Sequence, residues 1–254
     1  MPSPLILTPL TDFPLAEPGD DIAELLWQVL ERNDVGLEDG DILVVTQKII
    51  SKAENQVIPL DSVYLSHEAI RLSEETGKDP ALCQVIIDQS NHILRKRPGL
   101  IISEHRIGFV CANAGVDHSN LDQTKGDKVL CLPEDSDKSA EQIRVFLENK
   151  SGKEIGVLII DSHGRAWRLG TVGISIGTSM VPELVNKIGD RDLFGKELRA
   201  TVIAAADQLA AAAALVMGEA DEAVPIVHVR GFPYPLRDSS IKEVLRSKDK
   251  DLFR

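Results

Sequence analysis

Oxygen-bearing side chains gather in a short segment near the middle of the chain, residues 111–120 (CANAGVDHSN). A carboxylate (Asp117), two carboxamides (Asn113, Asn120) and a hydroxyl (Ser119) surround a glycine there. Such groups suit a hard divalent cation and the phosphate oxygens that it bridges. The alternative is an Asx-type turn, in which these side chains bond only their own backbone. One segment by itself leaves both interpretations open.

A second oxygen-rich segment, residues 161–165 (DSHGR), directly follows the apolar run GVLII. The run predicts a buried strand, and residues just beyond the end of such a strand are commonly delivered to a cleft. A local turn is again the alternative interpretation. Two such segments in one chain indicate a site for a metal ion and a nucleotide.

Positively charged side chains follow another apolar run, ILVVT, which also predicts a buried strand. Gln47, Lys48 and Lys52 come directly after it. In a chain of net charge −12, these lysines would supply the local positive charge that phosphates require. The alternative is an edge strand whose lysines discourage pairing with another sheet.

The composition bounds the class of protein. The 254 residues allow one domain or two intimately joined halves, and the negative charge opposes binding to nucleic acid or anionic membranes. The three cysteines lack a CxxC pair, and no N-terminal signal segment is present, so a cytoplasmic protein is expected. The alanine-rich run 204–217 is interrupted by polar residues and predicts a buried helix. The basic cluster 95–97 predicts a helix end.

Hydrophobic periodicity and turn residues predict the order of the elements. Helices are expected within 21–33, 66–94 (with a break at 76–80), 135–149 and 199–217, and a charged amphipathic helix from 238 onward. Strands are expected within 5–7, 42–46, 99–102, 107–111, 156–160 and 223–231. Glycines spread through 164–177 would let the backbone approach a neighbour closely. The pattern predicts an α+β fold with mixed sheets and packed helices.

Several separated blocks together resemble a known family. They read FPLAEPGDD, GDILVVTQKIISKAE, NAGVDHSN, DSHGRAWRLGTVGISIG, DLFGKELRATVIAAADQLAAAAALVMGEADE and VPIVHVRG. In this order, over nearly the whole chain, they are similar to the coenzyme F420-0:L-glutamate ligases, which extend a phospholactate-type deazaflavin precursor with glutamate. The resemblance implies a single catalytic domain over residues 1–254, with two intimately joined subdomains as an option and no additional C-terminal domain. It also implies an intertwined homodimer.

The resemblance implies a role for each matching residue. The catalytic positions are Lys52, Asp117 and Asp161, and the metal positions are Asp117, Asp161, Ser162 and Glu219. The nucleotide positions are Phe13, Pro14, Leu15, Ala16, Gln47, Lys48, Lys52, Asn120, Met217, Gly218, Glu219, Ala220, Asp221 and Glu222. Mg²⁺ or Mn²⁺, one or two ions per site, is the implied cofactor, GTP is the implied co-substrate, and K⁺ is a further candidate.

The activity implied is a GTP-dependent amide ligation in coenzyme F420 biosynthesis, in which glutamate joins F420-0 through an acyl phosphate, with release of GDP and phosphate. Positioning and charge neutralisation are what such phosphoryl transfer demands of a protein. Two alternatives are a ligase for a different phosphorylated carboxylate and a non-catalytic nucleotide-binding relative. His118 and His163 adjoin the carboxylates and could be ligands or structural residues. Arg165 and Arg168 could hold a substrate anion or form structural ion pairs.

Overall fold

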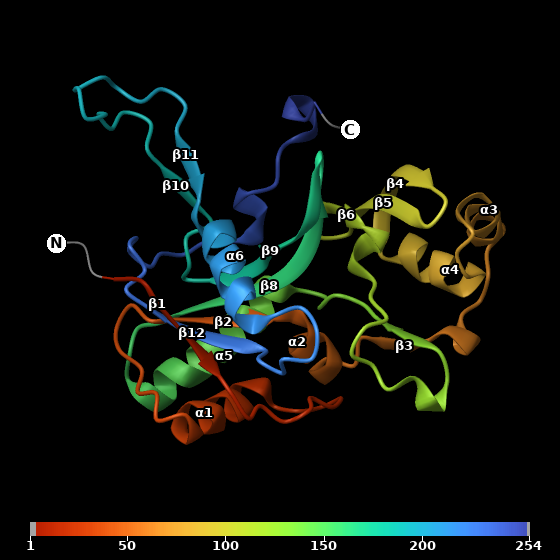
Figure 1. The fold of residues 1–254 in the computed structure, drawn as a ribbon, viewed down its shortest axis with the longest axis horizontal. Coiled ribbons are helices and arrows are strands. Elements are labelled where there is room, and N and C mark those ends of the chain that lie inside the picture. Colours follow the sequence, from red (N-terminus) through yellow and green to blue (C-terminus); the bar gives the residue numbers. More distant parts are fainter. Residues whose placement is uncertain (1–3, 253–254) are drawn as a thin grey trace.

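A mixed five-stranded β-sheet forms the centre of the computed structural model, which describes residues 4–252 (Figure 1). Its strand order is β1 (Ile6–Leu10), β12 (Ile226–Arg230), β2 (Ile42–Thr46), β8 (Gly156–Arg165) and β9 (Arg168–Ser179). β2 and β8 are parallel, and the other neighbours are antiparallel. The expected α+β fold with mixed sheets is therefore confirmed.

Helices cover both faces of this sheet. α1 (Ile22–Arg32) and α5 (Ser136–Ser151) contribute to one hydrophobic cluster, and α6 (Ala205–Met217) contributes to the cluster on the other face. Side chains of β2 alternate between the two clusters, because successive residues of a strand point to opposite faces. Burial on both faces explains why this strand is an unbroken apolar run in the sequence.

Two glycines let helices lie directly on β9. A Cβ atom on Gly177 would fall 2.4 Å from Ser136 Cβ, at the start of α5. A Cβ atom on Gly173 would fall 2.5 Å from the carbonyl oxygen of Ala210 in α6. The expected close approach is thus made to two helices, one on each face of the sheet.

A smaller part of the chain has its own hydrophobic cluster, on the right of Figure 1. It contains helices that pack on a three-stranded antiparallel sheet of order β4-β5-β6, beside the antiparallel pair of β3 and β7. Its elements are β3 (Val57–Pro59), α3 (His67–Thr76), α4 (Pro80–Asp88), β4 (Ser90–Arg97), β5 (Leu100–His105), β6 (Val110–Ala112) and β7 (Lys128–Leu130).

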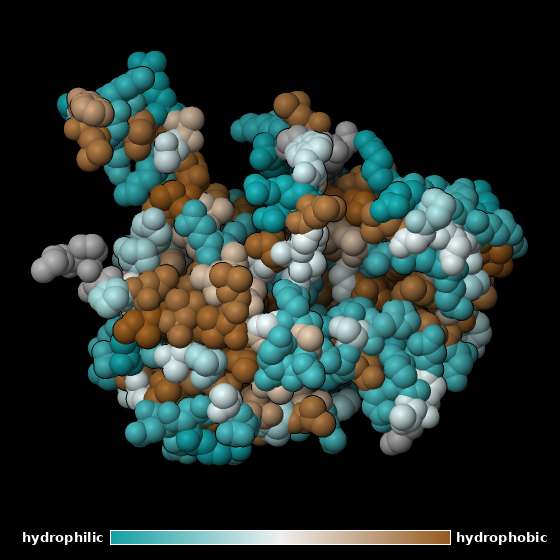
Figure 2. Space-filling model, viewed as in Figure 1, coloured by the Kyte–Doolittle hydropathy of each residue, from teal (hydrophilic) through white to brown (hydrophobic). Residues whose placement is uncertain are grey.

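A two-stranded ribbon projects from the body at the upper left of Figure 1. β10 (Leu184–Asn186) pairs antiparallel with β11 (Val202–Ala204), and we call residues 184–204 the arm. Figure 2 shows apolar residues on this arm, where Leu193 is 100% and Phe194 is 96% exposed. Large apolar side chains at a projecting tip are typical of a contact surface.

Three helix predictions were wrong in part. Residues 90–97 form β4, not the end of a helix, so the basic cluster 95–97 lies on a strand. The helix expected from residue 199 begins at Ala205, because β11 occupies the residues before it. The tail from residue 238 contains only short 3₁₀ turns, at Ile241–Glu243 and Lys248–Lys250. Ile241 is nevertheless buried, so this segment still docks on the body of the protein.

Two predictions about strands near the candidate site were also wrong. β8 continues to Arg165, so Asp161 and Ser162 lie within the strand and not beyond its end. The residues after β2 form the helix α2 (Gln47–Ala53), which excludes the edge-strand interpretation of the lysines. None of the described helices is long and apolar enough to cross a membrane.

Candidate functional site

A cavity of about 640 Å³ lies where β2 and β8 meet the smaller part of the chain. Its walls come from five separate stretches of sequence, residues 13–16, 46–52, 111–120, 160–171 and 214–225. The parallel pairing of β2 and β8 places the end of β2, at Thr46, beside Ile160, and β8 runs on from there along the cavity. Segments that lie far apart in the sequence therefore converge on one space.

Two lysines reach this cavity from α2. Lys48 and Lys52 are one helical turn apart and share a face, which lines the cavity. Gln47 and Ser51 point inward instead, and the Ser51 hydroxyl donates to Gln47 Oε1 at 2.8 Å. Burial, together with the charge of Lys48, lowers the pKa of Lys52. An anion bound beside Lys52 would offset that cost of burial.

Asp117 is held at the cavity by three polar contacts. Lys48 Nζ lies 2.7 Å from Asp117 Oδ2, and the Ser119 hydroxyl and backbone N–H donate to the carboxylate at 2.7 and 2.8 Å. The contact with the Ser119 backbone is an Asx-type turn. Asp117 therefore forms the local turn that the sequence allowed and also lines the cavity. Burial opposes ionisation, but these hydrogen bonds outweigh it and lower the pKa of Asp117.

Asp161 is fixed from behind by a row of rings. His163 Nε2 lies 3.0 Å from Asp161 Oδ2, and the His163 ring packs against Phe109 at 5.4 Å between centroids. Phe109 in turn stacks on His105 at 5.2 Å. Since His163 is only 7% exposed, this row leaves the carboxylate few positions other than facing the cavity.

Ser162 lies on the opposite face of β8 from Asp161, because neighbouring strand residues alternate. Its hydroxyl donates to Glu219 Oε1 at 2.8 Å, which ties the strand to the loop after α6. That loop begins at Gly218, which caps α6, and the Ala220 N–H donates to Glu222 Oε2 at 2.8 Å. The loop therefore closes over one side of the cavity.

Comparison with known proteins identifies the family. The sequence profile described as F420-0:Gamma-glutamyl ligase matches residues 11–231, which include every residue that lines the cavity. The chain belongs to the F420-0:gamma-glutamyl ligase family.

Named relatives of this ligase family cover nearly the whole chain. The coenzyme F420:L-glutamate ligase of Methanothermobacter thermautotrophicus is 45% identical over 243 residues, 95% of each chain. That of Methanocaldococcus jannaschii is 47% identical over 218 residues, 86% of each chain. That of Archaeoglobus fulgidus is 38% identical over 246 residues, 97% of this chain and 95% of the relative. The chain is therefore an enzyme of a ligase family, as the resemblance implied.

All but one of the residues that the family resemblance marked line this single cavity. The exception is Gln47, whose side chain is buried beside Ser51. The cavity wall also includes residues that the sequence did not single out. Thr171 is one example, because it reaches the cavity only through its pairing with Gly164 across the β8–β9 hairpin. No local pattern reveals that register before the hairpin is known.

The donors at the cavity fit the predicted divalent cation in their chemistry. Asp117, Asp161, Ser162 and Glu219 offer the oxygen ligands that Mg²⁺ or Mn²⁺ takes. Within residues 4–252, however, no three His, Cys, Asp or Glu side chains lie close enough to form a metal cluster. The carboxylates would therefore have to approach one another around an ion, and the predicted metal site stays a prediction.

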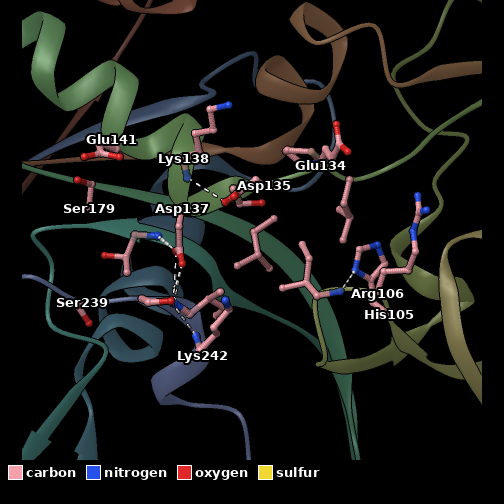
Figure 3. A pocket seen from close by; sticks show the side chains of 18 of the residues that line it. His105, Arg106, Glu134, Asp135, Asp137, Lys138, Glu141, Ser179, Ser239 and Lys242 are labelled. Carbon is pink, nitrogen blue, oxygen red and sulfur yellow. Dashed lines mark hydrogen bonds between the residues drawn. The ribbon is translucent and has the colours of Figure 1, made fainter.

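A larger cavity, of about 1260 Å³, lies between the start of α5, β9 and the turn after β5 (Figure 3). None of the predicted site residues lines it. Asp137 lines this cavity and accepts hydrogen bonds from the Thr178 N–H at 2.8 Å and the Ser240 hydroxyl at 2.6 Å. These contacts anchor the C-terminal segment on the sheet. The polar side chains of this cavity therefore have a structural role.

The cysteines have no chemical role at the candidate site. Cys83, Cys111 and Cys131 are all buried and free. Burial raises the pKa of the Cys111 thiol to about 12 and that of Cys131 to about 11. Both thiols are therefore protonated at neutral pH and unsuited to nucleophilic chemistry, although Cys111 lines the smaller cavity.

Proposed function

We propose that this protein is a GTP-dependent ligase that joins the amino group of L-glutamate to the terminal carboxyl of coenzyme F420-0, in coenzyme F420 biosynthesis. The observation that carries the proposal is the convergence of Asp117 and Asp161 with Lys48 and Lys52 on one cavity. Two carboxylates and two ammonium groups form the kind of set that metal-assisted phosphoryl transfer uses. The names of the relatives supply the acid and the amine.

The reaction must activate a carboxylate before the amine can attack it. In the proposed scheme the terminal phosphoryl group of GTP passes to the carboxylate oxygen, which gives an acyl phosphate and GDP. The glutamate nitrogen then forms a bond to the acyl carbon, the carbon–oxygen bond to phosphate breaks, and the nitrogen loses a proton. Phosphate and the amide are the products. Neither step requires a covalent bond to the protein.

Several polar residues of the cavity have a place in this scheme. Lys52 would neutralise charge on the phosphates, because this half-buried lysine lines the cavity and forms no ion pair with a carboxylate of residues 4–252. Residues 13–16 and 217–222 would enclose the nucleotide from two sides. Asp117, Asp161, Ser162 and Glu219 would hold Mg²⁺ or Mn²⁺, which would supply charge neutralisation for the phosphates. K⁺ remains a further candidate for the same negatively charged region.

The decisive experiment is incubation of the protein with GTP, Mn²⁺, L-glutamate and F420-0, followed by mass spectrometry of the deazaflavin. The proposal expects a mass gain of one or more glutamate units, with GDP released in step. GTP turnover with a different phosphorylated acid, but not with F420-0, would show that the proposed substrate is wrong and that the proposed type of reaction is right. If the protein binds GTP but shows no turnover under any of these conditions, the proposed ligase activity is wrong.

We also propose that the protein works as a homodimer in which the arm of one protomer contacts the other. The tip of the arm exposes Leu193 and Phe194 almost completely, and Ile188 is 50% exposed. A second copy of the chain would bury this apolar surface, which costs free energy when it faces water.

A further inference from the structure

A carboxyl group is buried at the root of the arm, away from both cavities described above. Glu183 directly precedes β10, is fully buried and lines neither cavity. Its carbonyl oxygen accepts a hydrogen bond from the N–H of Ala205 at 2.9 Å, where α6 begins. The chain enters the arm after Glu183 and returns from it at Ala205 (Figure 1). This one residue therefore joins both strands of the arm where they leave the body.

Glu183 also holds the C-terminal segment. Its N–H donates to the Ser239 hydroxyl oxygen at 3.0 Å. The Arg237 guanidinium donates to the carbonyl oxygen of Leu184, the next residue along, at 3.0 Å. The arm, the start of α6 and the C-terminal segment thus meet at one buried acid. Movement of this residue would loosen all three from one another.

The side chain of Glu183 lacks the partners that an ionised carboxylate needs. The Ser175 hydroxyl donates to Oε1 at 2.5 Å, but Oε2 has no hydrogen-bond partner among residues 4–252. Within the same residues no lysine, arginine or histidine forms an ion pair with it. A buried carboxylate without donors or a counter-ion is costly, so this geometry suits the neutral acid.

The charged groups around Glu183 favour the neutral acid as well. Carboxylates face it from three elements, namely Asp207 on α6, Asp137 on α5 and Glu243 in the C-terminal segment. The guanidinium that faces it, that of Arg237, is already paired with Glu243 at 2.6 Å. Burial, together with these carboxylates, raises the pKa of Glu183 to about 8.

We propose that Glu183 is a latch that fixes the arm to the body while its carboxyl group is protonated and releases the arm when that group ionises. Ionisation in place would leave an unpaired charge in the interior, so the charged side chain has to reach water. Its backbone is bonded to α6 and to the C-terminal segment, so it reaches water only when the root of the arm opens. The proton passes to the solvent.

The latch has a consequence for contact with a second copy of the chain. The arm carries the exposed Leu193 and Phe194 and is the proposed contact between protomers. An arm that is loose at its root has to be ordered when it binds, which weakens binding. Only this consequence rests on the homodimer proposed above, because the latch itself is a property of one protomer.

Hydrogen exchange from about pH 5.5 to about pH 7.5 tests the latch. Peptides that cover residues 201–206 report the amides bonded to Glu183, and peptides from β2 report the centre of the sheet. After correction for the intrinsic exchange rate, the opening constant at the root should rise about tenfold per pH unit, because the open state loses the proton that the closed state keeps. The β2 amides should stay far better protected.

Three variants isolate the carboxyl group. Glu183→Gln and Glu183→Met cannot ionise, so the opening constant at the root should not change with pH in either protein. Gln keeps the shape of the protonated acid and Met replaces it with an apolar chain, so one folded variant of the two suffices. Glu197→Gln, at an exposed acid within the arm, is the matched control and should behave as the wild type.

Two outcomes would overturn the latch. One is an opening constant at the root that does not change with pH in the wild type. The other is exchange at the root that is no faster than exchange in β2, because Glu183 would then ionise only when the whole protein unfolds. Either result would leave Glu183 as a buried acid with no control over the arm.

Light scattering at about pH 5.5 and about pH 8 tests the consequence for assembly. The wild-type dimer should dissociate at a severalfold higher protein concentration at the higher pH, and Glu183→Gln should dissociate at the same concentration at both. Equal dissociation of the wild type at both pH values would overturn the control of assembly. A monomer mass throughout would show that the proposed homodimer is wrong, while the exchange experiment would still decide whether the latch exists.

Discussion

Lys48 Nζ lies 2.7 Å from Asp117 Oδ2, and the same ammonium group also contacts the Ser119 hydroxyl. The two residues come from α2 and from the loop after β6, so the contact joins the central sheet to the smaller part of the chain. A divalent cation at Asp117 would have to replace this ammonium group, because both compete for the same oxygen. Under the proposed function, Lys48 would then be able to contact the phosphates of GTP.

The two lysines should contribute differently to activity. Lys52→Met removes a half-buried cation without breaking an ion pair, so it should lower kcat/KM for GTP by about 100-fold with little loss of stability. Lys48→Met should have a smaller effect on kcat/KM but should raise the pKa of Asp117, whose main stabilising partner it removes. Steady-state kinetics and thermal unfolding check both variants. Lys150→Met, at an exposed ion pair with Glu24, is the control. Equal losses in all three variants would contradict the assignment.

Asp161 should be essential to catalysis but not to folding. Asp161→Asn keeps the shape and the contact with His163 but removes the charge, so kcat should fall by about 10³-fold. GDP release at saturating Mn²⁺, with circular dichroism as a check on the fold, measures the effect. Asp61→Asn, at an exposed aspartate, should behave as the wild type. Full activity in Asp161→Asn would show that this carboxylate has no catalytic role.

Glu183 should make the stability depend on pH. Its side chain is fully buried, the Ser175 hydroxyl donates to Oε1 at 2.5 Å, and Oε2 has no partner among the described residues. Burial raises the pKa of Glu183 to about 8, and the carboxylates of Asp207, Asp137 and Glu243 add to this. The unfolded residue titrates near 4.5, so between that pH and about 8 only the folded state holds the proton. The free energy of unfolding therefore falls as the pH rises through this window.

Glu183→Gln removes that titration while it keeps the shape of the protonated acid. From about pH 5 to about pH 8 the wild type should lose on the order of 3 kcal/mol relative to this variant. Urea unfolding of both proteins across the window provides the measurement. Parallel stability curves would show that Glu183 is ionised in the folded protein.

Gly177 should tolerate no side chain. A Cβ atom would meet the Ser136 backbone, with 2.5 Å to its carbonyl carbon, so Gly177→Ala must push α5 away from β9. The expected loss of unfolding free energy is about 1–3 kcal/mol, as for other overpacked cores. Gly36→Ala is the control, because its Cβ would meet nothing within 4 Å. An unchanged urea midpoint for Gly177→Ala would mean that the helix can move without cost.

The arm should control assembly. Leu193→Asp and Phe194→Asp place charges on side chains that are almost fully exposed, so the fold of one protomer should not change. The proposed dimer should dissociate, because the partner would have to bury an unpaired charge. Light scattering after size-exclusion chromatography gives the mass, and Leu215→Asp, at an 88% exposed residue outside the arm, is the control. An identical dimer mass for all three variants would place the interface elsewhere.

Hydrophobic periodicity predicted a helix or strand correctly where the burial of that element is uniform along its length. The apolar run before Gln47 predicted β2 because both faces of that strand are buried, and helices α1 and α5 followed from their apolar stripes. The same method failed at residues 90–97, where β4 has mostly exposed, polar residues and is held by its pairing with β5. Propensity is a weak guide where tertiary pairing decides the conformation.

The sequence by itself determined the residue types of the candidate site, the family and the mixed fold, because these follow from side-chain chemistry and from patterns along the chain. The tertiary structure alone decided that Asp117, Asp161 and Lys52 line one cavity and that Gln47 does not. The physical reason is that strand register and helix packing depend on contacts between segments more than a hundred residues apart, such as the pairing of β2 with β8. No local stretch of sequence contains that information.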